Sequence, residues 1–414
     1  DGCATNTIIR EHRLMSDHTD WLPFWQNFCV LDLQVSNDHV CISLSPDEAQ
    51  LTCSVCGSPC RHIHERVRRR VRDLPMFGQP VILDLTLYRL DCAGCGRHLQ
   101  FVPWLDRHAR LTHRLAQAAA ECCARMPVAH VADMFGLHWS TVRRLDLQRL
   151  QALVASLPAA QPRRLIMDEF ALFKGHRYAS VILDADTRRV LYVAQDRTRR
   201  AIRPFFEQLG PEGCARIEAV AMDMNTAFDL EVRAQCPRAR VVYDLFHVIA
   251  KYGREVISRV RVDAANQLRH DRPARRVVKQ AHWLLLRNPA SLNEREQVRL
   301  DEVLQANQPI MTAHVMKESL RSLWTAPDAW EWRRRWQQWH AHAAESGIPA
   351  LMRFASALKP YWRGILARVR WPMHTGQLEG INNKIKVIKR MAYGYRDTDY
   401  FFLKIKAAFP GHAR

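Results

Sequence analysis

The spacing of hydrophobic and polar residues changes several times along the chain, and each change predicts a different kind of element. Residues 21–50 alternate in short segments, and VLDLQVSNDHVCISL has the period of two that is typical of strands. The run VILDLTLYRL, at residues 81–90, predicts a further strand. From Leu111 the pattern is helical, and it predicts helices over 128–135 and 139–150 with a turn at Gly136 between them.

Beyond Arg163 the pattern becomes rich in strands. RRLIMDEF, YASVILDA and RVLYVAQD predict three strands, a helix follows over 199–209, and IEAVAMDM and ARVVYDLF predict two more strands with a helix between them. Three strands followed by alternating helices and strands indicate an α/β domain with a mixed sheet. Residues 251–365 look helical throughout, and residues 376–392 form one strong helix candidate.

Composition and charge narrow the class of protein. With 48% hydrophobic and 25% charged residues, the chain has an ordinary globular composition and is not a disordered chain. Its net charge is +19, and the excess is spread: residues 1–50 hold 2 basic and 8 acidic side chains, whereas residues 151–414 hold 44 and 26. A basic surface that extends over several domains favours nucleic acid as the partner. The sequence shows no run of about 18 apolar residues and no signal-peptide pattern, which predicts a soluble intracellular protein with no membrane partner.

Two cysteine pairs predict a metal site. Cys53 and Cys56, and likewise Cys92 and Cys95, are separated by two residues, and a glycine follows each pair. Two such turns supply four thiolates in the tetrahedral arrangement that suits one structural Zn²⁺. A closed site of four thiolates stabilises its domain and leaves no position for catalysis. Three neighbouring side chains remain alternative ligands: Cys60, His62 and His64.

The segment VAHVADMFGLHWSTVRRLDL predicts a helix-turn-helix. Counted from Val128, a small residue stands at the fifth position (Ala132), a glycine at the ninth (Gly136) and a β-branched residue at the fifteenth (Val142). These are the positions where two crossing helices need close approach, a turn and a core contact. The second helix carries side chains that suit base edges and phosphates: Ser140, Thr141, Arg143, Arg144 and Gln148. An ordinary helical hairpin is the alternative.

Three carboxylates in the α/β domain are candidates for binding cations. Asp168 ends the first predicted strand and Asp223 ends the fourth, and in a mixed sheet of this order those two strands lie side by side. Carboxylates next to apolar runs are costly unless something compensates their charge. Glu379, on the C-terminal helix, is the best-placed third carboxylate. Hard oxygen ligands favour two Mg²⁺ or Mn²⁺ ions.

The helix that carries Glu379 also offers groups for a phosphodiester. Asn383 and Lys386 follow Glu379 at four and seven residues, so they share one face of the helix. Three further basic side chains on this helix are assigned to DNA binding: Lys384, Lys389 and Arg390.

With these motifs in place, the chain resembles the DDE transposases of bacterial insertion sequences, in the ISL-three family. The resemblance covers nearly all of the chain from Cys53 to Phe409, and YDLFHVIAKY and GQLEGINNKIKVIKRMAYGYRD are its most specific segments. It implies a ribonuclease-H-like catalytic core whose triad is Asp168, Asp223 and Glu379. The same resemblance singles out Asp244 as an alternative metal ligand. It also singles out His247, which would donate a hydrogen bond to a phosphate, orient Asp244 or serve as a plain core residue.

The resulting prediction is a multidomain chain. It comprises an N-terminal segment (1–50), a small zinc-ribbon-like finger (51–105), an α-helical helix-turn-helix domain (106–152), a linker (153–162) and a ribonuclease-H-like α/β domain (163–414) with an all-α insertion at about 255–365. The sequence begins with Asp1 rather than Met, so we expect a processed or truncated start and leave the first ten residues out of the fold argument.

The function implied is a transposase of the bacterial cytoplasm, associated with the nucleoid. It would bind the terminal inverted repeats of its element and target DNA as a homodimer or larger assembly, and it would cleave and transfer strands with two metal ions. Two alternatives remain: a sequence-specific regulator with a catalytically idle sheet domain, and a nuclease without strand transfer. The Trp-rich insertion would contact DNA, form a dimer surface or serve only as a helical core.

Overall fold

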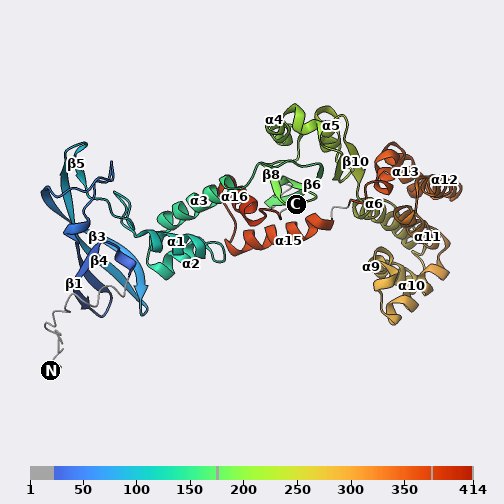
Figure 1. The fold of residues 1–414 in the computed structure, drawn as a ribbon. Coiled ribbons are helices and arrows are strands. Elements are labelled where there is room, and N and C mark those ends of the chain that lie inside the picture. The colour runs from blue at the N-terminus through green and yellow to red at the C-terminus, as the bar shows by residue number, and fades with distance from the viewer. Residues whose placement is uncertain (1–22, 174–176, 374–375, 413–414) are drawn as a thin grey trace, which may run out of the picture. The chain divides into compact units, whose positions relative to one another are not determined.

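The computed structural model describes residues 23–173, 177–373 and 376–412. The chain folds into two compact units, of which the first ends at Ala152 and the second begins at Leu153 (Figure 1). In these described ranges, no helix has both the length and the apolar composition that crossing a membrane requires.

The first unit begins with a five-stranded sheet in the order β1-β2-β4-β3, with β5 paired to the far end of β4. The strands are β1 (Phe28–Val35), β2 (Val40–Pro46), β3 (Ile63–Met76), β4 (Gln79–Cys92) and β5 (Gly96–Leu99). The pair β2–β4 is parallel and the other pairs are antiparallel. The strands β1 and β2, which the sequence suggested as part of a separate N-terminal segment, therefore belong to the same sheet as β3, β4 and β5.

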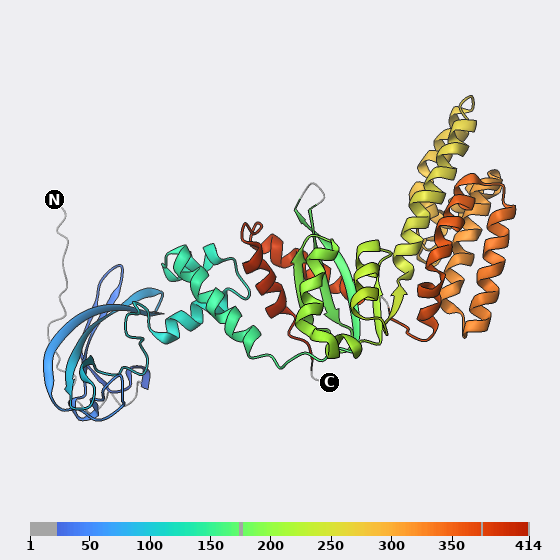
Figure 2. The same cartoon turned by 90° about the horizontal axis from the view of Figure 1, so that it is seen from above.

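Strands β3 and β4 are long, and β4 extends beyond the strand predicted over residues 81–90. Each has 14 residues, and Figure 2 shows them as long, curved strands. Alternate residues of β4 face a core that includes Trp25 and Val71, as the period of a strand requires. The opposite face of β3 exposes Arg66, Arg68 and Arg70. The Arg-rich run thus has the period of a strand, with arginine at the polar positions.

Three helices complete the first unit: α1 (His113–Cys122), α2 (Val128–Phe135) and α3 (Trp139–Ala155). Gly136 ends α2 in the left-handed conformation (φ 56°), which glycine adopts without strain. Val131, Ala132 and Val142 are buried where the helices cross. The close contacts predicted for a helix-turn-helix are therefore formed at Ala132, Gly136 and Val142.

Adjacent residues of β3 join the sheet to these helices. Arg72 donates hydrogen bonds to the carbonyl oxygens of Phe135 (2.9 Å) and Gly136 (3.3 Å). Asp73, which is fully buried, accepts from the indole of Trp25, the hydroxyl of Thr112 and the guanidinium of Arg114. A buried carboxylate with this many donors is stabilised as the anion, and these contacts lower the pKa of Asp73 although burial raises it.

The second unit is built on a mixed sheet in the order β10-β9-β6-β7-β8. Its strands are β6 (Arg164–Phe173), β7 (Arg177–Asp184), β8 (Val190–Gln195), β9 (Ala219–Met222) and β10 (Arg240–Tyr243). Strands β6, β7 and β8 are antiparallel, whereas β9 and β10 run parallel to β6. This is the mixed α/β arrangement predicted from the order of strands and helices.

Helices cover both faces of this sheet (Figure 1). One face packs against α4 (Arg199–Ala215) and α5 (Thr226–Gln235), through residues such as Phe206 and Phe228. The other face packs against α15 (Gly376–Met391) and α16 (Thr398–Ala408), through Leu378, Ile381 and Phe401. The last two helices of the chain therefore cover the sheet that begins at Arg164.

A helical insertion separates β10 from α15, over residues 245–369. Its α-helices are α6 (Leu245–Tyr252), α7 (Ser258–Gln267), α8 (Arg272–Gln280), α9 (His282–Leu286), α10 (Glu294–Ala306), α11 (Gln308–Ser322), α12 (Ala329–Glu345), α13 (Pro349–Leu358) and α14 (Trp362–Leu366). A π-helical segment over Gly253–Ile257 joins α6 to α7. The insertion returns to the sheet at Gly364, where a Cβ atom would lie 2.4 Å from the ring of Tyr243 at the end of β10.

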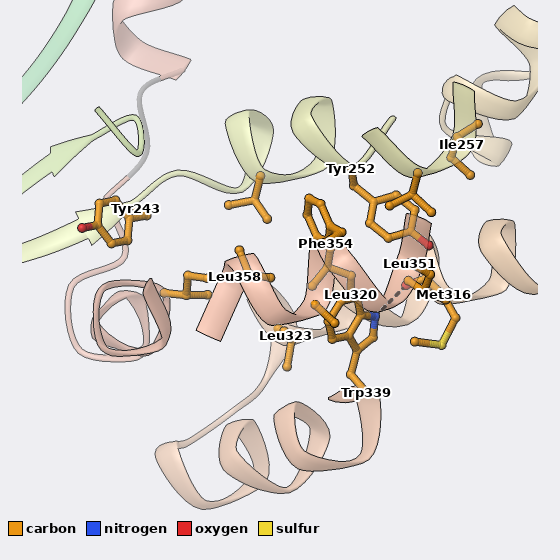
Figure 3. Packing of buried hydrophobic residues seen from close by; sticks show 14 of the residues in the cluster. Tyr243, Tyr252, Ile257, Met316, Leu320, Leu323, Trp339, Leu351, Phe354 and Leu358 are labelled. Carbon is orange, nitrogen blue, oxygen red and sulfur yellow. Dashed lines mark hydrogen bonds between the residues drawn. The ribbon is translucent and has the colours of Figure 1, made fainter. Parts of the chain in front are cut away.

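The insertion has its own core, drawn in Figure 3. Trp339 of α12 lies among Leu320, Leu351 and Phe354, and its indole nitrogen donates a 2.9 Å hydrogen bond to the carbonyl oxygen of Met316. Trp332, on the same helix, is also buried, whereas Trp330 is exposed. At least part of the tryptophan enrichment therefore serves core packing. The predicted fold class, a multidomain chain with a zinc-ribbon region, a helix-turn-helix and a mixed α/β domain, is confirmed.

We predict that Trp339→Ala lowers the free energy of unfolding by about 3–5 kcal/mol, because it leaves a cavity and a carbonyl oxygen without its donor. Trp330→Ala is the matched control on the same helix: its side chain is 71% exposed, so the expected change is within about 0.5 kcal/mol. Urea unfolding followed by far-UV circular dichroism measures both. Equal destabilisation by the two variants would contradict the packing described above.

Candidate functional site

Asp168, Asp223 and Asp244 lie in one row across three parallel strands. The paired residues Ile166 and Ala221 fix the register of β6 and β9, so Asp168 and Asp223, each two positions further, are level with one another. Tyr243 pairs with Met222, which places Asp244 level with Asp223. Asp223 and Asp244 directly follow the carboxyl ends of β9 and β10, where ligands of open α/β sheets bind.

The alternation of side chains puts the row on the face that α15 covers. Ile166, Ala221 and Val242, which lie two residues before the three aspartates, are packed in the cluster that contains Leu378 of α15. Side chains two residues apart on a strand share a face. Asp168 is within β6 rather than at its end, because the antiparallel pairing with β7 continues to Phe173.

Asp168 is nearly buried and bonded to α15. Its Oδ2 accepts a 2.9 Å hydrogen bond from the amide nitrogen of Asn382, and its Oδ1 accepts from the backbone of Glu169. Burial raises the pKa of Asp168, and these hydrogen bonds oppose the rise without cancelling it. Asn382 Oδ1 is buried too and has no hydrogen-bond partner among the described residues. An unused oxygen acceptor therefore lies next to a carboxylate that is costly to ionise.

Asp223 is paired with His247, at the start of the insertion. The Nδ1 atom of His247 lies 3.3 Å from Asp223 Oδ2. Burial raises the pKa of Asp223, but the hydrogen bond and charge of His247 outweigh it, so the pKa is lowered. The same contact raises the pKa of His247 although burial lowers it. His247, a proposed orienting group for Asp244, is in contact with Asp223.

Asp244 is the most buried of the three aspartates, and a cation of the insertion faces it. Burial lowers the pKa of the Arg368 guanidinium, and the charge of Asp244 opposes this shift without cancelling it. The same guanidinium donates to the carbonyl oxygen of Trp324. Asp223 has different surroundings from Asp244: it is more exposed, and the titratable His247 lies beside it.

Glu379 lies in the first turn of α15, three residues before Asn382, and its side chain is exposed. Leu378 and Ile381 anchor this turn on the sheet, so Glu379 is one helical turn from the residue that contacts Asp168. The carboxylates of Asp168, Asp223 and Glu379 do not form a compact cluster of potential metal ligands in the described parts of the chain.

Sequence reasoning selected Asn383 on α15 and missed Asn382. The signal was the position of Asn382 four residues after the buried Leu378, which puts a polar side chain on the sheet-facing stripe of the helix. A second unpredicted group is Glu169, which accepts from Arg197 (3.0 Å) and from the side chain of Asn225 (3.3 Å). This pairing ties β6 to the start of α5.

The basic residues of α15 have different surroundings. Lys389 donates to the carbonyl oxygens of Ala171 and Leu172 on β6, and Lys384 donates to that of Ala408 (3.2 Å). The amine of Lys386 lies 3.4 Å from Asn383 Oδ1, so these two share a face as the spacing predicts. Arg390 is exposed.

The four predicted cysteines come together at one end of the first sheet. The sulfur atoms of Cys53, Cys56, Cys92 and Cys95 all lie within 4.8 Å of one another, and those of Cys56 and Cys92 are 3.6 Å apart. The alternative ligand Cys60 donates instead to the carbonyl oxygen of Asp91 (3.2 Å), and His62 and His64 are exposed outside this cluster.

The thiols of this cluster shift one another's pKa. Hydrogen bonds from Ser58 and from neighbouring thiols lower the pKa of Cys56 to about 6, and the Cys56 side chain raises the pKa of Cys95 to about 12. Four thiolates at this spacing repel one another. A divalent cation with tetrahedral preference removes that repulsion, so the residues present fit Zn²⁺.

The second helix of the helix-turn-helix, α3, presents a mixed surface. Ser140, Arg144 and Gln148 are exposed, whereas Thr141 and Arg143 are half-buried. These exposed side chains lie four residues apart along the helix, so one face of α3 carries them. Trp139, at the start of the helix, is also exposed.

Comparisons with known proteins agree with this architecture. A profile of transposases matches residues 165–405, and profiles for the helix-turn-helix domain of transposase family ISL3 and for the zinc finger of the IS204, IS1001, IS1096 and IS1165 transposases match residues 102–150 and 49–95.

Two relatives align over most of the chain. The transposase for insertion sequence element IS1001 of Bordetella parapertussis is 52% identical over 395 residues, which are 94% of this chain and 97% of the relative. The transposase for insertion sequence element IS1557 of Mycobacterium tuberculosis (strain CDC 1551 / Oshkosh) is 26% identical over 371 residues, 83% of this chain and 82% of the relative. Because the transposase profile covers more than half of the chain and the first relative nearly all of it, the chain belongs to the transposase family ISL3.

Proposed function

We propose that this transposase cleaves and joins DNA strands at a metal site formed by Asp168, Asp223 and Glu379. The observation that carries the proposal is the register of β6 and β9, which sets Asp168 and Asp223 level on the face covered by α15. Glu379 begins that helix and is one turn from the Asn382–Asp168 hydrogen bond. Asp168 and Asp223 thus lie level on one face of the sheet, and Glu379 belongs to the helix that covers this face.

The residues at this place fit divalent cations with a preference for oxygen. Asp168 and Asp223 offer carboxylate oxygens, and the buried Oδ1 of Asn382 is a neutral oxygen that lacks a donor. Mg²⁺ or Mn²⁺ would be held by Asp168, Asp223 and Glu379. Two bound ions would activate the attacking oxygen and stabilise the leaving oxygen of a phosphodiester.

The neighbouring side chains have positioning and charge-balancing roles. Asn382 fixes the rotamer of Asp168 through a 2.9 Å hydrogen bond. His247 holds Asp223 and can keep its proton until a cation neutralises that carboxylate. Asp244 is buried, whereas Asp223 is half-buried and is therefore more accessible to a cation. We therefore retain Asp223 as the ligand and Asp244 as an accessory group.

DNA binding is assigned to two surfaces. The exposed face of α3 would contact the terminal inverted repeats in the major groove, and Asn383, Lys386 and Arg390 of α15 would contact phosphates near the cleavage site. Lys384 and Lys389 carry charge beside this surface while they anchor α15 and α16. Pairing two ends of an element requires at least two active sites, so we propose that the chain acts as a homodimer or larger assembly on DNA.

We predict that Asp168→Asn abolishes Mg²⁺-dependent strand cleavage and retains DNA binding. The amide removes the charge that would hold the cation, and even indirect changes at metal sites cost about 10–100-fold in activity. Cleavage of a labelled duplex that carries the element's end, in Mg²⁺, measures the loss, and anisotropy with the same duplex measures binding.

Glu218→Gln is the matched control for this experiment, because Glu218 directly precedes the opposite end of β9. It should cleave like the wild type. Wild-type protein that binds the duplex without cleaving it would favour a regulator with an idle sheet domain. Cleavage without joining to target DNA would favour a nuclease.

We also propose one structural Zn²⁺ in the cysteine cluster. Cys53→Ser is expected to lose the bound zinc and to destabilise the first unit, because a structural zinc site contributes its binding free energy to folding. Native mass spectrometry gives the zinc content. Cys60→Ser should keep its zinc, since the Cys60 thiol bonds a carbonyl oxygen. Unchanged zinc in Cys53→Ser would argue against this set of ligands.

For the helix-turn-helix, we predict that Arg144→Ala weakens binding to the element's end by about 1–3 kcal/mol and reduces the preference over unrelated DNA. The guanidinium is exposed on α3 and can reach a base edge. Competitive anisotropy measures both affinities. Arg125→Ala removes an exposed charge after α1 and should weaken binding to the element's end and to unrelated DNA equally. An unaltered preference in Arg144→Ala would exclude this contact.

A further inference from the structure

The turn that joins β3 to β4 has a residue that its conformation and packing do not explain. Met76 pairs with Gln79, so the turn consists of Phe77 and Gly78, both with positive φ (52° and 80°). Two-residue turns of this kind favour asparagine, aspartate or glycine, and a bulky aromatic residue in this region is a backbone outlier. Phe77 is also 97% exposed, so its ring contacts almost nothing in the protein.

The turn lies beyond a fixed base. Arg72 is bonded to the carbonyl oxygens of Phe135 and Gly136, in the turn before α3, and its backbone pairs with Arg110 and Thr112. Asp73, the next residue, is held in the buried network with Arg114. The four residue-to-residue steps from Arg72 to Met76 span roughly 13 Å of extended chain. The hairpin tip is therefore a short arm anchored beside the helix-turn-helix.

The arm is bent where it leaves this base. The register between β3 and β4 shifts between Asp73 and Met76, with the extra residue in β3, and Pro75 lies in the shifted segment. Such a bulge bends a strand and re-aims its end. A Cβ atom on Gly78 would find no atom within 4 Å, so the space around the tip is open.

The exposed face of β3 behind the arm is basic. Arg66, Arg68 and Arg70 lie on this face, and Arg110 is exposed at the base of the arm. The acidic residue opposite Arg70 on β4 is Asp84, so the face keeps a positive excess. An apolar tip on a basic hairpin matches the way in which architectural proteins insert apolar side chains between base pairs in the minor groove.

We propose that the β3–β4 tip is a minor-groove arm: Phe77 inserts between base pairs beside the site bound by α3, and the arginines of β3 bind the flanking phosphates. The reach of the arm matches the step from the major groove to the neighbouring minor groove, which is about half of a 34 Å helical turn. Partial unstacking by the ring bends the duplex. This inference rests on the proposed function, because it needs α3 on DNA.

Phe77→Asn tests the arm. Asparagine suits the positive φ and removes the ring, so thermal stability should not fall, whereas affinity for a duplex with the element's terminal repeat should fall about tenfold, or about 1.4 kcal/mol. In the wild-type complex, 2-aminopurine placed at successive steps beside the α3 site should brighten at one step, and end-to-end energy transfer should report a bend. Both signals should be lost in Phe77→Asn and restored in Phe77→Trp.

Phe101→Ala, which removes another exposed aromatic ring from the same unit, should leave affinity, 2-aminopurine signal and bend unchanged. If wild type and Phe77→Asn bind the duplex with equal affinity and bend it equally, the proposal of a minor-groove arm is overturned while the proposed function stays intact. A wild type that does not bind the duplex would overturn both. A change in sedimentation of the free protein on Phe77→Asn, with DNA binding intact, would show that the tip docks on a second copy instead.

Discussion

The register of three parallel strands is the constraint on which the candidate catalytic centre depends. Strands β6, β9 and β10 pair over only a few residues. This pairing nevertheless fixes which residue of one strand lies beside which residue of the next. Because side chains alternate, a slip of one residue would turn Asp223 into the opposite cluster, under α4 and α5. The buried apolar residues on both faces prevent such a slip, so the hydrophobic core determines where the charges lie.

The helical insertion supports this arrangement from one side. It contributes His247 and Arg368, which face Asp223 and Asp244, and it returns to the sheet where Gly364 fits against Tyr243. Its own core, around Trp339, makes it a stable body rather than a loose loop. An insertion of this kind supplies the counter-charges that a sheet edge rich in carboxylates needs while it holds no cation.

Much of the layout followed from the sequence, because strong periodicity and cysteine spacing are local signals. The helix over Val128–Phe135, the glycine turn and the neighbouring positions of the strands that carry Asp168 and Asp223 are examples. The sequence did not indicate that β3 is a 14-residue strand, since arginine is uncommon at so many positions of one strand. Asn382 and the Glu169–Asn225 pair were missed because they depend on how a helix and strands far apart in sequence meet. Which carboxylates hold metal ions stays a prediction.

The packing of α15 and α16 on the sheet has a consequence for protein synthesis. Asp168 and Asn382, which bond to one another, are 214 residues apart, and one face of the sheet is covered mainly by α15 and α16. While a ribosome is still making the insertion, α15 and α16 do not yet cover that apolar face. The nascent chain must therefore shield the face from aggregation or postpone formation of the sheet. A chain released early, before residue 376, would have the zinc-ribbon sheet and α3, the helix proposed to contact DNA, without Glu379. Incomplete copies would therefore still hold the parts proposed to bind DNA, and would lack the proposed means to cut it.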